Sequence, residues 1–132
     1  MIRQQFNVRH YWGVIVFYCL DYNSLNMLAH ELKQIGFSWK QVVSILYELK
    51  TGNARACTCS NFERHISIVI FNPHKSRKDY INSIVHEAEH VKQAMLKAYH
   101  VKDKGEPPAY TIGYLVEKMY EGFKRLICES CT

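Results

Sequence analysis

The chain has 132 residues, and its 17 Lys and Arg outnumber 12 Asp and Glu, which gives a formal net charge of +5. This length predicts a single domain, residues 1–132, that forms a hydrophobic core without disulfide bonds. A hydrophobic fraction of 48% and a charged fraction of 22% are typical of a soluble globular protein. The positive charge is spread along the chain without a nucleic-acid-binding motif, so a nucleic-acid partner is not expected.

The beginning of the chain has none of the features of a targeting segment. The first residues (MIRQQ) are mostly polar, and the apolar run Trp12–Leu20 is far shorter than the ~20 residues of a membrane-spanning helix. We therefore expect a cytoplasmic protein with no membrane partner. Nothing in the pattern indicates an oligomeric state.

The first half of the chain predicts one strand followed by two helices. Residues 11–20 (YWGVIVFYCL) are aromatic and β-branched, which is typical of a buried strand. The next segment predicts a helix with Asn23 or Ser24 as its N-cap and Gly36 at its C-terminal end. A second helix is capped by Ser38. Its apolar stripe consists of Val42, Ile45, Leu46 and Leu49.

The second half predicts two strands and two longer helices. Residues 54–73 form two strands joined at Ser60-Asn61, with Pro73 closing the second. A long helix is predicted from about Arg77 to Val101. After the loop KDKGEPP, a last amphipathic helix carries two prolines near its first turn, where they are tolerated. The expected fold class is α+β, with helices first and last and a small sheet between them.

The five cysteines form two close pairs and one single residue. Cys57 and Cys59 lie at i and i+2 on a predicted strand and therefore face the same way. Cys128 and Cys131 lie at the end of the chain. The two pairs together allow a four-thiolate zinc site, but reduced thiols are the simpler interpretation for a cytosolic protein.

The pentapeptide HEAEH within the long helix carries the strongest functional signal. His86 and His90 are one helical turn apart, about 40° from each other around the axis, so both imidazoles can reach one metal ion. Glu87 lies beside that point, where a carboxylate can take a proton from a metal-bound water. The pattern H-E-x-x-H therefore predicts two zinc ligands and a base. Polar residues on a solvated helix face remain the alternative, because the histidines face away from the main apolar side.

A third zinc ligand is expected downstream, where two glutamates are candidates. Glu106 begins the last helix, and Glu117 follows on nearly the same helical face. The two carboxylates are ~16 Å apart along the axis, so only one can reach the metal. Tyr110 and Gly113 share that face. A glycine inside a helix costs up to ~1 kcal/mol, which close approach to the histidine-bearing helix or tight packing would explain.

The segment HEAEH followed by GEPPAYTIGYL resembles small zincin-like metallopeptidases encoded by bacteria and their phages. It is also similar to the gluzincins, whose third ligand often lies in a Glu-x-x-Ala-(Asp/Asn) segment at a helix start. The resemblance covers roughly residues 62–120. It implies a zincin-like domain in which the long HExxH helix packs on a small sheet and a C-terminal helix. It also implies that His86, His90 and Glu106 bind Zn²⁺ and that Glu87 is the general base.

The implied activity is a zinc metallopeptidase that hydrolyses peptide bonds of a polypeptide substrate by a zinc-activated water. Tyr110 replaces the acidic or amide residue of the gluzincin pattern, so support for a zinc histidine must come from elsewhere. Tyr110, Tyr114 and His100 are the candidate donors to a developing oxyanion. The resemblance implies that the strand His65–Phe71 flanks the cleft, as the corresponding strand does in zincins. This strand either pairs with the substrate by its edge or is an ordinary core strand.

Two other functions stay open. A non-catalytic, zinc-stabilised binding module, phage-encoded and acting on a host protein, would use the same ligands only to fix the last helix. A basic nucleic-acid binder would carry the pentapeptide by coincidence and would bind in a salt-sensitive way. We interpret the other histidines as surface or capping residues: His10, His30, His65 and His74.

Overall fold

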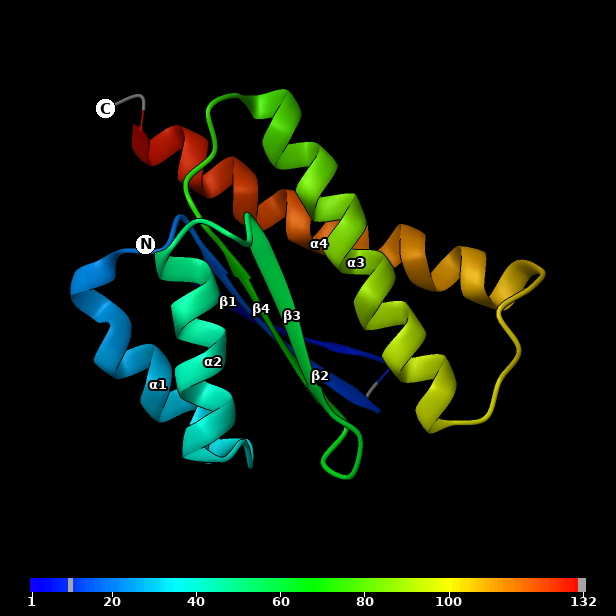
Figure 1. Cartoon of the computed structure of the whole chain (residues 1–132). Coiled ribbons are helices and arrows are strands. Elements are labelled where there is room, and N and C mark those ends of the chain that lie inside the picture. Colours follow the sequence, from blue (N-terminus) through cyan, green and yellow to red (C-terminus); the bar gives the residue numbers. More distant parts are fainter. Residues whose placement is uncertain (10, 131–132) are drawn as a thin grey trace.

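The computed structural model describes residues 1–9 and 11–130. The chain begins with two strands, β1 (Ile2–Val8) and β2 (Trp12–Tyr18), and a 3-10 turn, η1 (Tyr22–Ser24). Two helices follow, α1 (Leu25–Gln34) and α2 (Trp39–Lys50), and then two strands, β3 (Ala56–Asn61) and β4 (Ile66–Phe71). The two longest helices come last, α3 (Arg77–Ala98) and α4 (Glu106–Ser130). The result is an α+β fold: a four-stranded mixed sheet followed by two long helices that pack on it (Figure 1).

The sheet has the strand order β1-β2-β4-β3. β2 and β4 lie in the centre and pair in parallel, with Val14 opposite Ser67, while β1 and β3 are antiparallel edge strands. The central strands WGVIVFY and ISIVIF are nearly continuous apolar runs because both of their faces are covered. β3 pairs with β4 alone, so the other edge of β3 is free within the described sheet.

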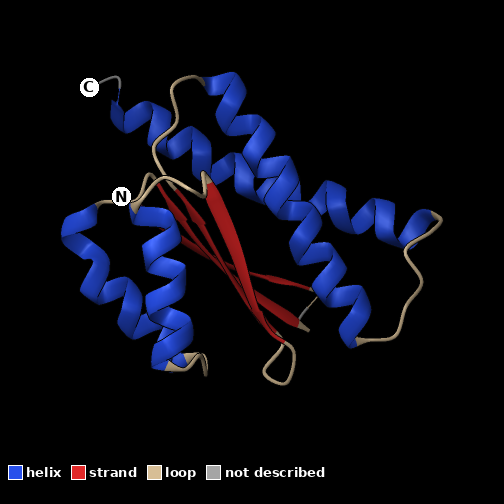
Figure 2. Ribbon diagram, viewed as in Figure 1, coloured by secondary structure: helices blue, strands red, loops and turns tan. Residues whose placement is uncertain are grey.

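Helices cover both faces of the sheet, which makes three layers (Figure 2). On one face, α1 and α2 bury Leu28, Leu32 and Leu49 against the side chains of Phe17 and Ile70. On the other face, α3 and α4 pack on alternate residues of the same strands. This second core consists mainly of Val14, Val16, Val69, Phe71, Ile84, Ala88, Val91, Leu115, Met119 and Phe123.

The face of the sheet that carries the second core is shared between α3 and α4. α3 contacts β3 and β4, whereas α4 contacts β1 and β2, and the two helices cross and contact each other (Figure 1). The side of α3 that faces away from α4 therefore lies beside the free edge of β3. This arrangement decides which residues can meet the histidines of α3.

The ends of the helices follow local signals in the sequence. Ser38 and Gln41 form a capping box at the start of α2, and the hydroxyl of Ser76 accepts from the main-chain N–H of Asp79 at the start of α3. After α1, Gly36 has φ +104°, a left-handed conformation that glycine adopts without steric cost. The predictions of Ser38 as a cap and of Gly36 at a helix end are confirmed.

Three expectations about the elements were wrong. β1 was not predicted, so the chain begins with two strands where one was expected, helices do not come first, and the sheet has four strands. The β3–β4 hairpin turns through residues 62–65, because β3 continues through Asn61. The long helix ends at Ala98, three residues before Val101, where Tyr99 and His100 leave the helix and His100 takes φ +56°. Among the described residues, no helix combines the length and apolarity needed to cross a membrane.

Candidate metal and catalytic site

His86 and His90 lie on the exposed side of α3 and face each other. Their Nε2 atoms are 3.2 Å apart, and their rings are nearly perpendicular at a centroid distance of 4.8 Å. Two nitrogen ligands that bind one tetrahedral zinc at ~2.0–2.1 Å lie ~3.3 Å from each other. The spacing of the two Nε2 atoms therefore fits two positions of a tetrahedral site. The side chain of His86 is 66% exposed, so the pair opens to solvent.

Glu87 lies next to the pair but points under β3. Its side chain is only 6% exposed, and its Oε1 accepts a hydrogen bond of 2.9 Å from the Thr58 hydroxyl. Its other carboxylate oxygen, Oε2, lies 3.9 Å from Nε2 of His86. Thr58 thus holds one oxygen of the carboxylate, and the second oxygen is the one turned toward the histidines.

His90 borders a hollow between β3 and α3. Its volume is about 320 Å³, and it is lined by residues of β3, of the hairpin and of α3: Thr58, Ser60, Phe62, His90, Gln93, Ala94 and Lys97. β4 pairs on both sides, so the strand His65–Phe71 is a core strand and offers no edge to a peptide. The alternative interpretation of that strand is therefore the correct one, and β3 is the edge strand beside the motif.

Thr58 contacts the candidate base Glu87, and the sequence did not indicate this contact. It lies 29 positions before Glu87 and belongs to no motif. The alternation of β3 is the only local signal, because it places Thr58 on the face opposite Cys57 and Cys59. Which helix covers that face depends on the order of the strands.

The structure does not bring the two candidate third ligands to the histidines. The described residues contain no group of three His, Cys, Asp or Glu side chains placed to hold one metal ion. Glu106 is exposed in the first turn of α4. Pro107, the next residue, lines the same hollow as Met95 and Tyr99. Met95 follows His90 by about 8 Å along the axis of α3, and Tyr99 lies just beyond the end of that helix.

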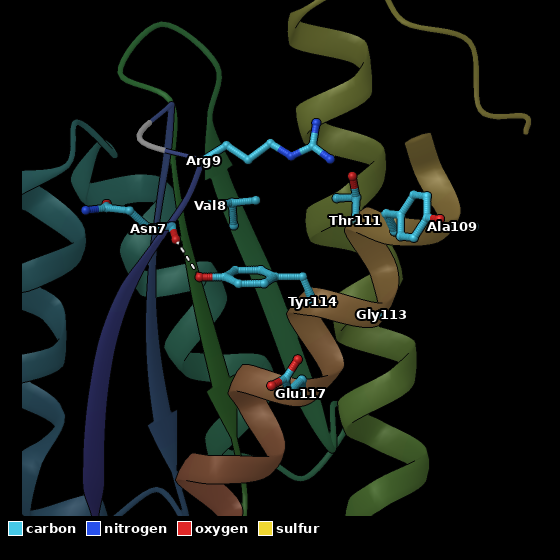
Figure 3. Close-up of a pocket in the computed structure, with 9 residues that line it drawn as sticks. Asn7, Val8, Arg9, Ala109, Thr111, Gly113, Tyr114 and Glu117 are labelled. Atoms are coloured by element: carbon cyan, nitrogen blue, oxygen red, sulfur yellow. Dashed lines mark hydrogen bonds between the residues drawn. The ribbon is translucent and has the colours of Figure 1, made fainter. Parts of the chain in front are cut away.

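Glu117 lies at the opposite edge of the sheet from β3. It lines a hollow of about 880 Å³ between α4 and the end of β1, together with Asn7 and Arg9. Figure 3 shows Tyr114 extending across this hollow between Arg9 and Glu117, with its hydroxyl donating to the main-chain oxygen of Asn7 at 3.1 Å. The described fold therefore separates Glu117 from His86 and His90.

The residues considered as oxyanion donors also lie away from the pair. Tyr110 and Tyr114 line the same hollow as Glu117, and Tyr110 is 66% exposed. His100 is exposed in the connection after α3. Gly113 does not approach α3 closely, because a Cβ built on it meets nothing within 4 Å. The expectation that Gly113 marks a close contact was wrong.

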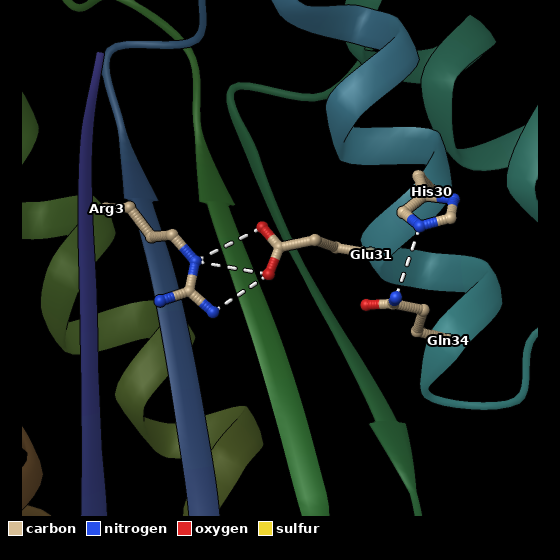
Figure 4. A network of polar contacts seen from close by, with 4 residues as sticks. All are labelled: Arg3, His30, Glu31 and Gln34. Carbon is tan, nitrogen blue, oxygen red and sulfur yellow. Dashed lines mark hydrogen bonds and ion pairs between the residues drawn. The ribbon is translucent and has the colours of Figure 1, made fainter.

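The remaining histidines differ in their surroundings. His30 is exposed on α1 and contacts Gln34, beside the ion pair between Arg3 of β1 and Glu31 (Figure 4). His65 stacks on Trp12. His74 contacts the main-chain oxygen of Asn72 at 2.6 Å and the Ser83 hydroxyl at 2.7 Å, and its burial lowers its pKa below the ordinary value. His10 lies outside the described residues.

The cysteines do not complete a metal site in the part of the chain that is described. Cys57 and Cys59 lie together on β3 and pack toward α1 and α2, on the opposite face from Thr58. Cys131 lies outside the described residues, as does the side chain of Cys128, so the four-thiolate alternative falls outside them too.

Comparison with known proteins gives no relative for this chain. No protein-family model, curated protein sequence or solved structure matches it significantly. The function must therefore be inferred from the geometry of the site.

Proposed function

We propose that the protein is a zinc-dependent peptidase in which His86 and His90 bind the metal and Glu87 is the general base. One observation carries the proposal: the 3.2 Å spacing of the two Nε2 atoms occurs together with a carboxylate that turns one oxygen toward them. An exposed pair of histidines on a helix needs no buried glutamate behind it. The buried position of Glu87, held by Thr58, supports a role at the pair.

Glu87 would transfer the proton of a zinc-activated water. When bound, zinc supplies a water with a pKa lowered toward ~7 and polarises the carbonyl of the substrate. The free oxygen of Glu87 accepts the proton of the attacking water and delivers it to the leaving amine. The hydrogen bond from Thr58 keeps that oxygen at the histidines instead of letting the carboxylate rotate away.

The free edge of β3 supports a polypeptide as the substrate. An extended peptide can add to an exposed strand edge by main-chain hydrogen bonds, which give affinity with little choice of sequence. β3 presents such an edge directly beside His90, above the hollow that contains Ser60 and Phe62. A peptide paired there would pass the histidine pair along the direction of the strand.

The third ligand that we propose is Glu106, and it requires a movement of the chain. The connection from Tyr99 to Gly105 is tied to α3 by Lys92, which contacts Asp103 at 3.0 Å and Glu89 at 2.9 Å. Burial opposes the charged form of Lys92, but these two carboxylates hold its pKa above the ordinary value. Release of this contact would free the segment that leads to Glu106.

The experiment measures metal and cleavage in the same set of variants. Untagged protein should contain one zinc per chain by native mass spectrometry and should cleave fluorescently labelled casein. His90→Ala should lose the metal, whereas His30→Ala, an exposed histidine on α1, should retain it. Glu106→Ala should lower zinc content and Glu117→Ala should not.

The decisive variant is Glu87→Gln, which should keep the zinc and abolish cleavage. Glu48→Gln, an exposed glutamate on α2, is the matched control and should cleave like the parent protein. Equal cleavage by Glu87→Gln and the parent would refute the peptidase. Retention of zinc by both Glu106→Ala and Glu117→Ala would refute a ligand from α4.

A second function is favoured by one observation, the lack of a third ligand among the described residues. A non-catalytic module could bind zinc through His86 and His90 alone and use a partner protein to fill the remaining positions. In that case Glu87→Gln leaves partner binding unchanged, and a chelator lowers the unfolding temperature of the complex more than that of the free protein.

A further inference from the structure

The free-edge strand β3 carries two thiols on the face opposite the candidate site. Cys57 and Cys59 are at i and i+2, so their side chains leave the strand in the same direction. Cys59 belongs to the core beneath α1 and α2, Cys57 is half-buried beside it, and the two thiol groups form a hydrogen bond. The described fold therefore places two cysteine side chains in contact.

The residue between the two cysteines is Thr58, which holds Glu87. Any change in the backbone between Cys57 and Cys59 acts on Thr58, because it is the single residue that separates them. The Thr58 hydroxyl lies 2.9 Å from Oε1 of Glu87 and 3.4 Å from its main-chain oxygen. The thiol pair and the carboxylate are thus linked through one side chain.

We propose that Cys57 and Cys59 are a redox-active dithiol, which a hydroperoxide closes to an intramolecular disulfide, and that closure shifts Thr58 and with it the carboxylate of Glu87. The part that concerns Glu87 rests on the proposed function. The disulfide itself does not.

The reaction requires only the peroxide and the two thiols. The sulfur of Cys59, as thiolate, attacks one peroxide oxygen, the O–O bond breaks, and the sulfenic acid forms as hydroxide (or alkoxide) leaves and takes up a proton. The sulfur of Cys57 then attacks the sulfur of Cys59, the S–S bond forms, and water leaves with the proton of Cys57. Two electrons pass from the thiols to the peroxide. The hydrogen bond from Cys57 lowers the pKa of Cys59 and thus favours its thiolate, while it raises the pKa of Cys57.

Closure has a mechanical consequence for the strand. Equivalent atoms of residues i and i+2 of a strand, including their Cβ atoms, are about 6.6–6.8 Å apart. The two Cβ atoms of a disulfide are only about 3.5–4.5 Å apart. The two cysteines must therefore approach each other, and the strand must buckle at Thr58. β3 can do this because it pairs on one side only, and edge strands accept such irregularities. Thr58 then no longer meets Glu87 in the same geometry.

The test uses a protein in which the other cysteines, Cys19, Cys128 and Cys131, are replaced by serine. The folded protein is treated with hydrogen peroxide, quenched, unfolded and alkylated, and the tryptic peptide 56–64, which contains both thiols, is analysed by mass spectrometry. We expect the peptide to lose both alkyl groups and to regain them after dithiothreitol. A further Cys57→Ser replacement should abolish the bridge. Two alkylated thiols after treatment, or a bridge that forms equally fast in urea-unfolded protein, would overturn the proposal.

A second measurement follows the link to Glu87 without metal or activity. In the metal-free protein, oxidation should shift the methyl NMR signal of Thr58 and leave that of Thr111 on α4 unchanged. An unshifted Thr58 signal in disulfide-bonded protein would overturn the link. If the reduced protein cleaves casein, oxidation should also stop cleavage in the parent and not in Cys57→Ser. Absence of cleavage in reduced protein would instead count against the proposed function, while the peptide mass still decides the dithiol.

Discussion

Two glycines of α4 provide a direct test of how this helix packs. A Cβ built on Gly122 would lie 2.5 Å from Cε2 and 2.6 Å from Cζ and the hydroxyl oxygen of Tyr18. A Cβ built on Gly113 in the same helix meets nothing within 4 Å. The same substitution by alanine should therefore have opposite effects at the two positions.

The magnitude at Gly122 follows from the surroundings of Tyr18. The ring is fully buried and stacks on Phe71 and Tyr80, so it cannot move aside freely. Its hydroxyl lies 2.6 Å from Oε1 of Gln4 and 2.9 Å from the main-chain oxygen of Met119. Overpacking costs about 1–3 kcal/mol and disturbed hydrogen bonding about 1–2 kcal/mol, against about 1 kcal/mol gained from the helix propensity of alanine. The net destabilisation is about 1–4 kcal/mol.

Thermal unfolding followed by circular dichroism measures both variants against the parent protein. Gly122→Ala should lower the unfolding temperature by roughly 4–14 °C, and Gly113→Ala should raise it by roughly 3 °C, for a domain of this size. Urea unfolding should give the same order. A Gly122→Ala protein as stable as the parent would refute the packing of α4 against Tyr18 on which the layer arrangement depends.

Three further predictions concern the surroundings of the site. Thr58→Val should destabilise the protein by about 1–3 kcal/mol in urea unfolding, because Glu87 loses its buried hydrogen bond, and unchanged stability would contradict that role. Burial lowers the pKa of His74, so the unfolded chain binds more protons, and stability should fall as the pH drops from ~6.5 toward the lowered native value. His74→Gln should remove this part of the pH dependence, and equal pH dependence in both proteins would argue against it. Lys92→Met should speed amide hydrogen exchange in residues 99–105, where unaltered rates would show that the ion pairs do not hold the connection.

The elements with strong local patterns could be predicted from the sequence. These patterns depend on neighbours within a few residues: the apolar run of β2, the capping box of Ser38 and the helical periodicity of α3. β1 has no such pattern, because IRQQFNV contains polar residues between its buried ends and gains its place by pairing with β2. Edge and centre in the sheet are likewise decided by distant pairing, so the roles of β3 and β4 could not be predicted.

The same division holds for the site. The spacing of His86 and His90 follows from the helical period alone, and the structure places their nitrogens together. The partner of Glu87 could not be predicted, because Thr58 belongs to the sheet and Glu87 to the helix layer packed on it. Glu106 and Glu117 were selected on helical periodicity and resemblance, neither of which determines that α4 covers β1 and β2.

The parallel pairing of β2 with β4 also bears on how the chain folds. β1 and β2 are joined by a short turn and can form a hairpin locally. Val14 of β2 pairs with Ser67 of β4 only when a long loop closes, and this loop includes α1 and α2. Closing such a loop loses chain entropy before any contact compensates for it, which makes the step slow. β3 and β4 can pair as a local hairpin, and Glu87 is enclosed when α3 packs on this hairpin and the Thr58 hydroxyl meets its carboxylate. The hairpins β1–β2 and β3–β4 can therefore form separately, and the parallel pairing of their inner strands is the step that joins them into one sheet.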